Sequence, residues 1–364
     1  MDLLKILIQS SEKAANIARL LRQNDKLFQK LVEQKSSEEA NPRFQEDFKT
    51  LADVLIQEMV KYDVGIKFPY LKNKIYGEEN NHFYSSKLNK EMTIEIQETQ
   101  EETSSLLSEL FNDNEEIAKL LATEVHKVVE LENIYTKYPV DDFSMDLNKL
   151  SIWIDPIDGT NEYVKGGYEE KIGNLYPKGL KCVTVLIGVY DDNSEPIIGI
   201  INQPFFDKDT DIGFQCNWGV SYMSENGSLI NFSSVDYAEF ERNRIIFVGG
   251  NETNVVSLLQ EQGYNTAVST GAGYKLLAVI LGLVDAYVLS KPTTYFWDTC
   301  APQAILKSIG GNIITMDSLK RKQKDFIRYH NITNETKCNK NGIVAYRDEQ
   351  ILSDLMEIDW TSIL

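Results

Sequence analysis

Three apolar runs rich in β-branched residues follow one another in the middle of the chain and constrain its fold more than any other feature. They are residues 182–190, 196–202 and 213–223. Each has the length of a strand, and the link between the first two, Asp191-Asp192-Asn193-Ser194, has the composition of a hairpin turn. Consecutive strands joined by short turns pair antiparallel. We therefore expect a mainly antiparallel sheet in the N-terminal part, with helices packed against it.

The pattern changes after about residue 239. Strand-like runs at 245–248 and 286–289 alternate with helical patterns, one of which leads from the small-residue turn 269–275 through Leu281. Such alternation is typical of an α/β layer. The sequence therefore predicts an α+β fold with two domains, residues 1–238 and 239–364, the second built on a smaller α/β sheet.

Helical periodicity dominates the chain before these strands. We predict one helix up to about Gln34 and another from about Asn41 to Tyr62, the second with Phe48, Leu51, Leu55 and Met59 on its core face. Asp53 interrupts that face, so it is either exposed or paired, because an unpaired buried acid is costly. The acidic segment from about residue 85 to 149 is mostly helical in pattern. We interpret it as an insertion that covers one side of the first domain.

Composition disfavours several functional classes. The net charge is −18, which argues against binding a nucleic-acid polymer. Three histidines without a His-x-x-x-His pair argue against zinc and against a serine–histidine triad. Four widely spaced cysteines indicate reduced thiols. No signal peptide or membrane-spanning run is visible, so we expect a cytoplasmic monomer without a membrane partner.

Residues 151–160 carry the strongest chemical signal. Residues 151–154 predict a buried strand, which Asp155 and Pro156 end. Asp158 follows, Gly159 allows a positive φ or a close approach, and Thr160 stands at a helix start whose free N–H groups suit an anion. Carboxylates gathered at a strand end are ligands that Mg²⁺ prefers. The same residue types also form surface turns, and the local pattern supports both interpretations equally.

Other candidate residues are individually ambiguous. Glu78 and Glu79 follow a short apolar run, where an acidic pair is usually solvated. Asp298 has the position of a helix cap. Residues 270–275 combine a helix start with Lys275, which suits either a phosphate or a plain helix N-terminus.

Together these stretches resemble the lithium-sensitive, magnesium-dependent phosphomonoesterase superfamily of inositol phosphatases, bisphosphate nucleotidases and fructose-1,6-bisphosphatase. The shared pattern is Asp-Pro-x-Asp-Gly/Ser-Thr, here residues 155–160, with the upstream Glu78-Glu79 turn and the downstream Trp297-Asp298 pair. Segments spread over most of the chain are most similar to the inositol polyphosphate 1-phosphatase branch: 50–55, 67–69, 77–79, 182–191, 201–205, 271–275 and 282–285. The resemblance implies a layered αβαβα sugar-phosphatase-like fold.

The resemblance also implies a site with two or three Mg²⁺ ions. One ion is held by Glu78, Asp155 and the Ile157 carbonyl, a second by Asp155, Asp158 and Asp298, and Glu79 contributes to a third. Asp53 orients Thr160, which positions the attacking water, and these two with Glu78 are the implied catalytic residues. Li⁺ is implied as an inhibitor at a Mg²⁺ position. The implied substrate-binding residues are Asp158, Gly159, Thr160, Gly271, Ala272, Lys275 and Thr293.

The implied activity is removal of the 1-phosphate from inositol polyphosphates such as inositol 1,4-bisphosphate and inositol 1,3,4-trisphosphate. Two differences leave the substrate open: Gly159 stands where that branch usually has serine, and residues 248–252 lack its serine- and lysine-bearing pattern. One alternative is a 3′(2′),5′-bisphosphate nucleotidase acting on 3′-phosphoadenosine 5′-phosphate. Another is a non-catalytic protein that binds inositol phosphates or Ca²⁺, although a pure binder needs no water-activating pair such as Asp53 and Thr160.

Overall fold

A six-stranded sheet with the order β10-β9-β8-β7-β6-β3 forms the first half of the fold. The computed structural model describes residues 2–23, 28, 32–34, 48–85, 90–111, 115–138, 145–224, 226–235, 242–332 and 335–363. Strands β6 to β9 pair antiparallel in chain order, as predicted, β10 continues the series without having been predicted, and β3 adds to the edge parallel to β6. Their bounds are β3 Ile75–Gly77, β6 Ser151–Asp158, β7 Thr184–Tyr190, β8 Pro196–Asn202, β9 Cys216–Met223 and β10 Leu229–Ser233.

The second sheet has five strands in the order β12-β11-β13-β15-β14. Its central strand β13 is parallel to β11 and antiparallel to β15, so the sheet is mixed. The alternating pattern predicted β11 and β13, whereas β12, β14 and β15 were not predicted. The bounds are β11 Ile245–Val248, β12 Asn265–Val268, β13 Ala286–Leu289, β14 Asn312–Thr315 and β15 Ile343–Tyr346.

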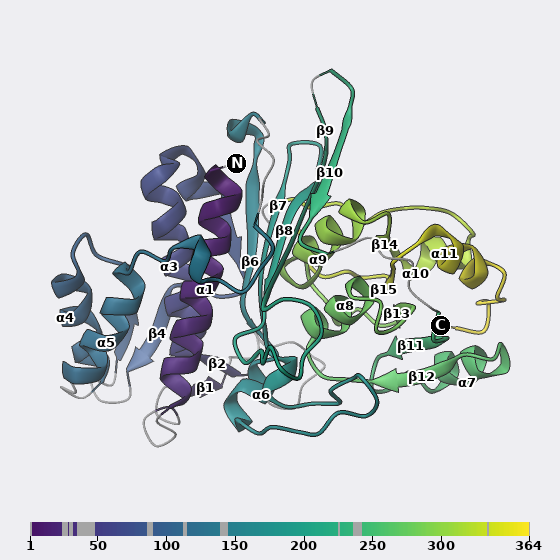
Figure 1. The fold of residues 1–364 in the computed structure, drawn as a ribbon, viewed down its shortest axis with the longest axis horizontal. Helices are drawn as coiled ribbons and strands as arrows, with labels where there is room; N and C mark the ends of the chain where they lie inside the picture. The colour runs from purple at the N-terminus through teal and green to yellow at the C-terminus, as the bar shows by residue number, and fades with distance from the viewer. Residues whose placement is uncertain are drawn as a thin grey trace.

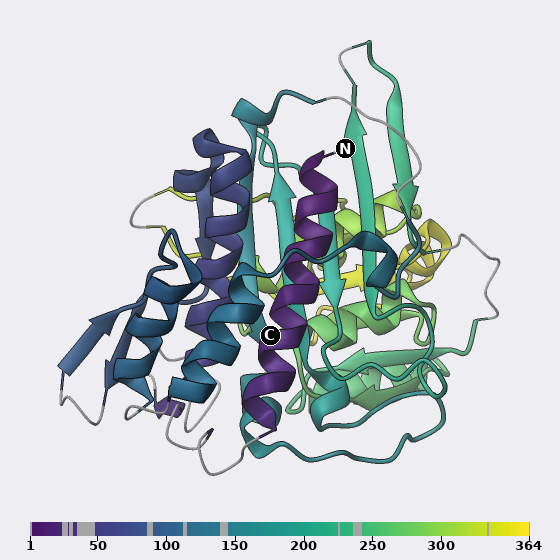
Figure 2. The ribbon, with the colours of Figure 1, turned by 60° about the vertical axis from the view of Figure 1, so that its left-hand side comes forward.

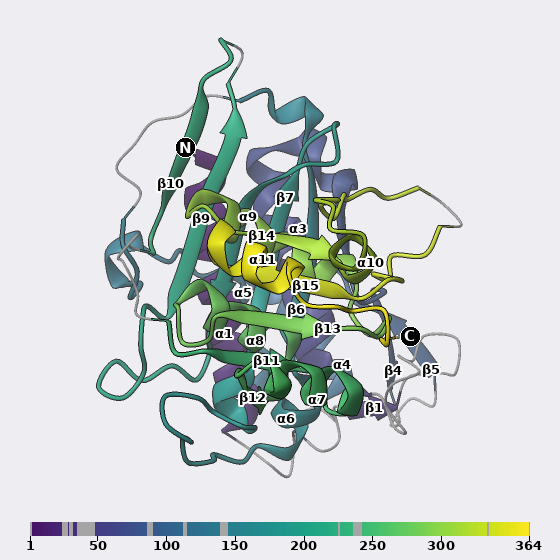
Figure 3. The ribbon, with the colours of Figure 1, turned by 90° about the vertical axis from the view of Figure 1, so that its right-hand side faces the viewer.

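Helices cover both sheets and fill the space between them, which gives the predicted αβαβα layers (Figure 1). The outer face of the large sheet packs on α1 (Asp2–Arg22) and α3 (Leu51–Lys67), and Figure 2 shows α1 running across that face. Between the sheets lie α8 (Ala272–Ile280) and α9 (Phe296–Ser308). Figure 3 looks onto the outer side of the small sheet, which α7 (Thr253–Glu261), α10 (Met316–Lys320) and α11 (Glu349–Met356) cover.

The N-terminal helices are shorter than predicted. Residues 32–34 form strand β1, which pairs with β2 (Phe48–Thr50), so the prediction of one helix up to residue 34 is wrong. Helix α3 begins at Leu51 because the Thr50 hydroxyl accepts a hydrogen bond from the N–H of Asp53 while the Asp53 carboxylate accepts one from the N–H of Thr50. The predicted start near residue 41 lies outside the described residues. Leu51, Leu55 and Met59 are buried as expected.

The acidic segment forms a hairpin and two helices beside α1. Strands β4 (His82–Ser85) and β5 (Lys90–Thr93) pair antiparallel, and helices α4 (Gln100–Leu110) and α5 (Glu115–His126) follow. Helix α5 packs against α1, so the segment covers one side of the molecule, at the left of Figure 1. The helical prediction is therefore confirmed for the central part of the segment. The predicted domain boundary near residue 239 lies outside the described residues.

A row of three glycines lets α9 lie directly on the large sheet. Gly188, Gly199 and Gly219 are neighbours in register across β7, β8 and β9. A Cβ atom at Gly188 would lie 2.5 Å from the Ala301 N, and one at Gly199 would lie 2.0 Å from the Ala301 O. Backbone therefore packs on backbone along this row. The contact fixes the height of α9 above the sheet, and the first turn of α9 carries Asp298.

Candidate metal centre

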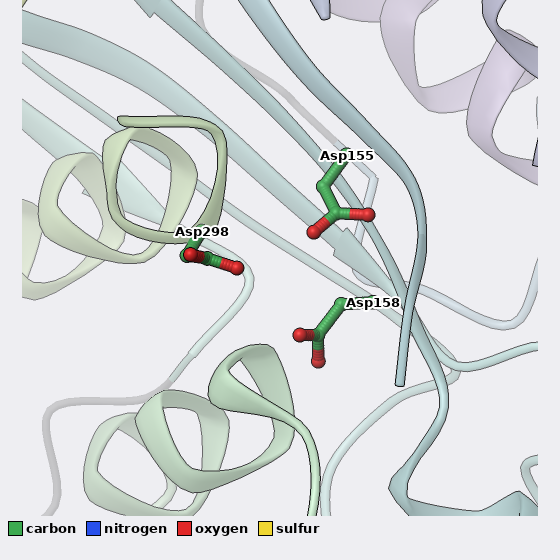
Figure 4. A group of neighbouring side chains, drawn as sticks. All are labelled: Asp155, Asp158 and Asp298. Carbon is green, nitrogen blue, oxygen red and sulfur yellow. The ribbon is translucent and has the colours of Figure 1, made fainter. Parts of the chain in front are cut away.

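Three buried aspartates meet where β6 ends and α9 begins. One carboxylate oxygen of each of Asp155, Asp158 and Asp298 lies within 4.8 Å of those of the other two. Figure 4 shows the carboxylates of Asp155 and Asp158, from β6, facing the one from α9 across a shared space. Asp298, 140 positions or more after the other two, therefore joins them in one acidic cluster.

An extra residue in β6 brings the first two aspartates to the same side. Asp155 pairs with Leu186 and Asp158 pairs with Thr184, so three steps on β6 match two on β7. Residues an odd number of positions apart in a regular strand point to opposite faces, and a bulge with one extra residue cancels that alternation. The prediction that β6 ends at Asp155 is therefore wrong. The strand continues past Pro156 through an irregularity that aims both carboxylates into the site.

The turn after β6 holds the next predicted residues. Gly159 has φ 86°, a left-handed conformation that favours glycine, and it precedes the short helix α6 (Thr160–Lys165). The Thr160 hydroxyl donates a 2.9 Å hydrogen bond to the Ile157 carbonyl oxygen. Two of the predicted groups, the Thr160 hydroxyl and the Ile157 carbonyl, are thus in direct contact.

Helix α8 presents its first N–H groups to Asp158. Its carboxylate accepts hydrogen bonds from the N–H of Ala272 (3.0 Å), the N–H of Gly273 (2.9 Å) and the Thr184 hydroxyl (3.2 Å). A Cβ atom at Gly273 would lie 2.2 Å from the Thr184 Oγ1, so only glycine allows this approach. The sequence left this helix start open between a phosphate site and a plain helix N-terminus, and its first N–H groups bind a protein carboxylate. Sequence reasoning did not single out Gly273 or Thr184, although Gly273 stood in the small-residue turn.

Asp298 combines the two roles considered for it. Its carboxylate accepts a hydrogen bond from the N–H of Tyr295 at 2.5 Å, which caps the start of α9. The same side chain completes the acidic cluster. A capping function therefore does not remove this carboxylate from the site.

The cluster is electrostatically strained without a cation. Burial raises the pKa of Asp155 well above its usual range, and the nearby carboxylates of Glu78, Asp158, Asp298 and Asp53 raise it further. Burial likewise raises the pKa of Asp298 far above normal, with Asp158 and Glu78 adding to the effect. The pKa of Asp158 rises only to about 6, because the N–H groups of Gly273 and Ala272 oppose the effect of burial.

The donor set fits Mg²⁺. The Asp155 Oδ1 is buried and has no hydrogen-bond partner within the described part of the chain. A buried carboxylate oxygen without a partner is costly, and a hard divalent cation bound by several carboxylates would relieve both that cost and the mutual repulsion. This observation supports the predicted ligands Asp155, Asp158 and Asp298.

Two of the predicted acids outside this triad, Glu78 and Asp53, lie close enough to raise the pKa of Asp155. The N–H of Glu78 donates to the carbonyl of Ile154, directly beside Asp155. The Glu79 backbone is bound by the Gln57 side chain. Asp53 acts on the pKa of Asp155, and its carboxylate accepts hydrogen bonds from Thr50. The contact between Asp53 and the Thr160 hydroxyl stays a prediction.

Two predicted substrate-binding residues have their polar groups buried in protein. Lys275 is 1% exposed, and its ammonium group lies 4.7 Å from the centre of the Tyr287 ring. Its charge lowers the pKa of Asp158 and Asp298, so it partly neutralises the cluster. The Thr293 hydroxyl is buried without a hydrogen-bond partner among the described residues. Direct contact of either residue with a substrate stays a prediction.

Comparisons with known proteins agree with this geometry. The model of the inositol monophosphatase family matches residues 2–352. The chain is 40% identical to a Mus musculus inositol polyphosphate 1-phosphatase over 98% of this chain and 96% of the relative. A Mus musculus 3′(2′),5′-bisphosphate nucleotidase 1 is 32% identical over 45% of this chain and 49% of its own. The crystal structure of the suppressor protein suhB from Bartonella henselae covers both chains fully at a TM-score of 0.56 and 13% identity, which supports the fold.

Proposed function

The chain belongs to the inositol monophosphatase family, and from this premise we propose that it is a Mg²⁺-dependent phosphomonoesterase acting on inositol polyphosphates. The proposed reaction removes the 1-phosphate from substrates such as inositol 1,4-bisphosphate and inositol 1,3,4-trisphosphate. The observation that carries the proposal is the buried aspartate triad with the unpartnered oxygen of Asp155. The full-length similarity to an inositol polyphosphate 1-phosphatase supports the substrate class.

In the proposed mechanism the carboxylates serve as ligands. Asp155, Asp158 and Asp298, with Glu78 and the Ile157 carbonyl, would hold two Mg²⁺ ions, and Glu79 would contribute to a third position. When bound, Mg²⁺ supplies Lewis-acid stabilisation of the charge on the phosphoryl oxygens. Because the acids are used as ligands, we expect no covalent phosphoenzyme. Li⁺ would inhibit by taking a Mg²⁺ position.

The remaining site residues bind and orient the reactants. We propose that the Thr160 hydroxyl orients the attacking water, takes up its proton and passes its own proton to the Asp53 carboxylate, for which it turns from the Ile157 carbonyl. The N–H groups of Gly159 and Thr160 hold the scissile phosphate at the start of α6. The rest of the substrate lies toward Gly271, Ala272, Lys275 and Thr293. This arrangement provides in-line positioning and charge stabilisation, which phosphoryl transfer requires.

A phosphate-release assay over a panel of substrates tests the proposal. The panel contains inositol 1,4-bisphosphate, inositol 1,3,4-trisphosphate, inositol 1-phosphate and 3′-phosphoadenosine 5′-phosphate, each with Mg²⁺ and with excess chelator. We expect the highest kcat/KM on the inositol polyphosphates and no turnover in chelator. A higher kcat/KM on the nucleotide would assign the chain to the nucleotidases. Binding of inositol phosphates without release of phosphate would indicate the non-catalytic alternative.

A further inference from the structure

A buried glutamine on α3 binds the backbone of the acidic turn that follows β3. We propose that Gln57 is a positioning residue that sets the Mg²⁺ affinity of the site by holding Glu78 and Glu79 in place. The inference rests on the proposed function, because it concerns the Mg²⁺ that the acids would bind. No Mg²⁺ ligand comes from Gln57 itself, so its effect passes through the turn.

The Gln57 amide binds both polar backbone groups of Glu79. Its Nε2 donates to the Glu79 carbonyl oxygen at 2.6 Å, and its Oε1 accepts from the Glu79 N–H at 3.1 Å. A side-chain amide with one donor and one acceptor so placed substitutes for the peptide group of a neighbouring strand. Gln57 is fully buried, so water does not compete for these hydrogen bonds.

The turn is also held from its other side. The N–H of Glu78 donates to the Ile154 carbonyl at 3.1 Å, which continues the parallel pairing of β3 with β6 by one residue. Ile154 directly precedes Asp155. The backbone of Glu78 and Glu79 is thus fixed between Gln57 of α3 and Ile154 of β6, one residue from Asp155.

Gly77 and Gln57 are sterically matched. A Cβ atom at Gly77 would lie 1.7 Å from the Gln57 Oε1 and 2.5 Å from its Cδ. Only glycine before the Glu-Glu pair lets the amide reach the Glu79 backbone. Gln57 also stands four residues after Asp53, on the same face of α3. One helix face therefore carries both Asp53 and the side chain that holds the acidic turn.

The Gln57→Ala variant tests the proposal through Mg²⁺ affinity. We expect the Mg²⁺ concentration for half-maximal activity to rise about 10- to 100-fold, the range for residues that orient metal ligands. At saturating Mg²⁺, kcat should stay within about threefold of the parent, since Gln57 touches neither substrate nor water. Isothermal calorimetry of Mg²⁺ binding, without substrate, should show the same loss of affinity.

A matched control separates positioning from a general loss of stability. Asn202 is an equally buried amide. Its side chain donates to Ser11 and Glu12, and neither hydrogen bond involves the Glu78-Glu79 turn. Asn202→Ala should lower the melting temperature without changing the Mg²⁺ affinity. An unchanged Mg²⁺ affinity in a folded Gln57→Ala variant, or an equal loss in Asn202→Ala, would overturn the proposal.

A double-mutant cycle tests the steric match directly. Gly77→Ala should weaken Mg²⁺ binding because the new methyl group displaces the Gln57 amide. In the Gln57→Ala background the same change should add little, since the colliding atoms are gone. Fully additive effects would show that the two residues do not act together. Calorimetry measures Mg²⁺ binding without any hydrolysis, so it tests the role of Gln57 independently of the proposed activity. If the parent protein binds Mg²⁺ but hydrolyses no inositol phosphate, only the proposed function is contradicted.

Discussion

Asp155 is surrounded by more negative charge than any single hydrogen bond could compensate. Its pKa is raised by burial and by Glu78, Asp158, Asp298 and Asp53, and its Oδ1 finds no partner in the described part of the chain. Such a residue lowers the stability of the metal-free fold. Removing one charge from the cluster should therefore have opposite effects on stability and on catalysis.

Asp298→Asn should abolish turnover without unfolding the protein. An asparagine oxygen can still accept the hydrogen bond from the Tyr295 N–H, so the cap of α9 persists. The loss of a charged ligand should lower kcat/KM by more than about 100-fold, beyond the range for residues that only orient ligands. The melting temperature in chelator should equal or exceed that of the parent, because repulsion falls. Full phosphate release by this variant would remove Asp298 from the metal site.

The sequence predicts the aspartates that the structure brings together, but not the residues that position them. The motif residues 155–160 and the pair Trp297-Asp298 are contiguous, so their chemistry is visible in the sequence. Gln57 and Thr184 act over long separations, and a lone glutamine or threonine gives no local signal. The β-bulge between Asp155 and Asp158 depends on pairing with β7, which local reasoning about Pro156 could not supply.

Helix α9 links the acidic cluster to the large sheet at the scale of elements. The glycine row on β7, β8 and β9 sets the separation between the helix backbone and the sheet. Asp298 occupies the first turn of the same helix, so a shift of α9 moves its carboxylate relative to those of Asp155 and Asp158.

Gly199→Ala should therefore impair both stability and metal binding. Its Cβ would lie 2.0 Å from the Ala301 carbonyl oxygen, a backbone atom that cannot rotate away. Overpacking of this kind costs about 1–3 kcal/mol and should lift α9 from the sheet. Chemical denaturation and Mg²⁺ titration measure the two effects. Gly250→Ala is the control, since no atom lies within 4 Å of its new Cβ; equal behaviour of the two variants would contradict this role of the row.

The elements that the sequence predicted well are those with strong local patterns. Residues 196–202 were predicted with the bounds that β8 has, because polar turns flank a continuous apolar run. Strands β14 and β15 have four residues each and were missed, since they are defined by pairing with β13 and with each other. The start of α3 was misplaced because its capping box at Thr50 and Asp53 was not recognised.

The whole molecule encloses the acidic cluster between two sheets, with carboxylates from both halves of the chain. Asp155 and Asp158 come from β6 of the large sheet, and Asp298 comes from α9 in the layer between the sheets. A bound cation would therefore connect the layers and stabilise the native state as a unit. None of the helices in the described ranges is long and apolar enough to cross a membrane.

The stabilisation by Mg²⁺ should grow as the pH rises. The pKa of Asp158 is raised from 3.8 to about 6 in the folded protein, and those of Asp155 and Asp298 are raised further. The folded state then holds more protons than the unfolded chain above pH 3.8, so the metal-free protein loses stability through this range as the pH increases. Mg²⁺ competes with those protons for the carboxylates.

We expect the difference in melting temperature between Mg²⁺ and chelator to increase from about pH 5 to about pH 7, on either side of the pKa of about 6 at which Asp158 loses its proton. Thermal unfolding in matched buffers of constant ionic strength measures it. Asp158→Asn should show a smaller difference throughout. A difference that is constant or decreases with pH would mean that the cation does not bind these carboxylates.

The glycine row has a consequence for thermal motion. Core side chains exchange between rotamers as temperature rises, and a helix seated on them shares that disorder. Where the backbone of α9 contacts the glycines of the sheet, no side chain lies between them that could change rotamer on heating. The amide hydrogens of β8 and of the middle of α9 should accordingly exchange with solvent only through global unfolding. The position of the Asp298 carboxylate, in the first turn of α9, should vary little up to the melting transition.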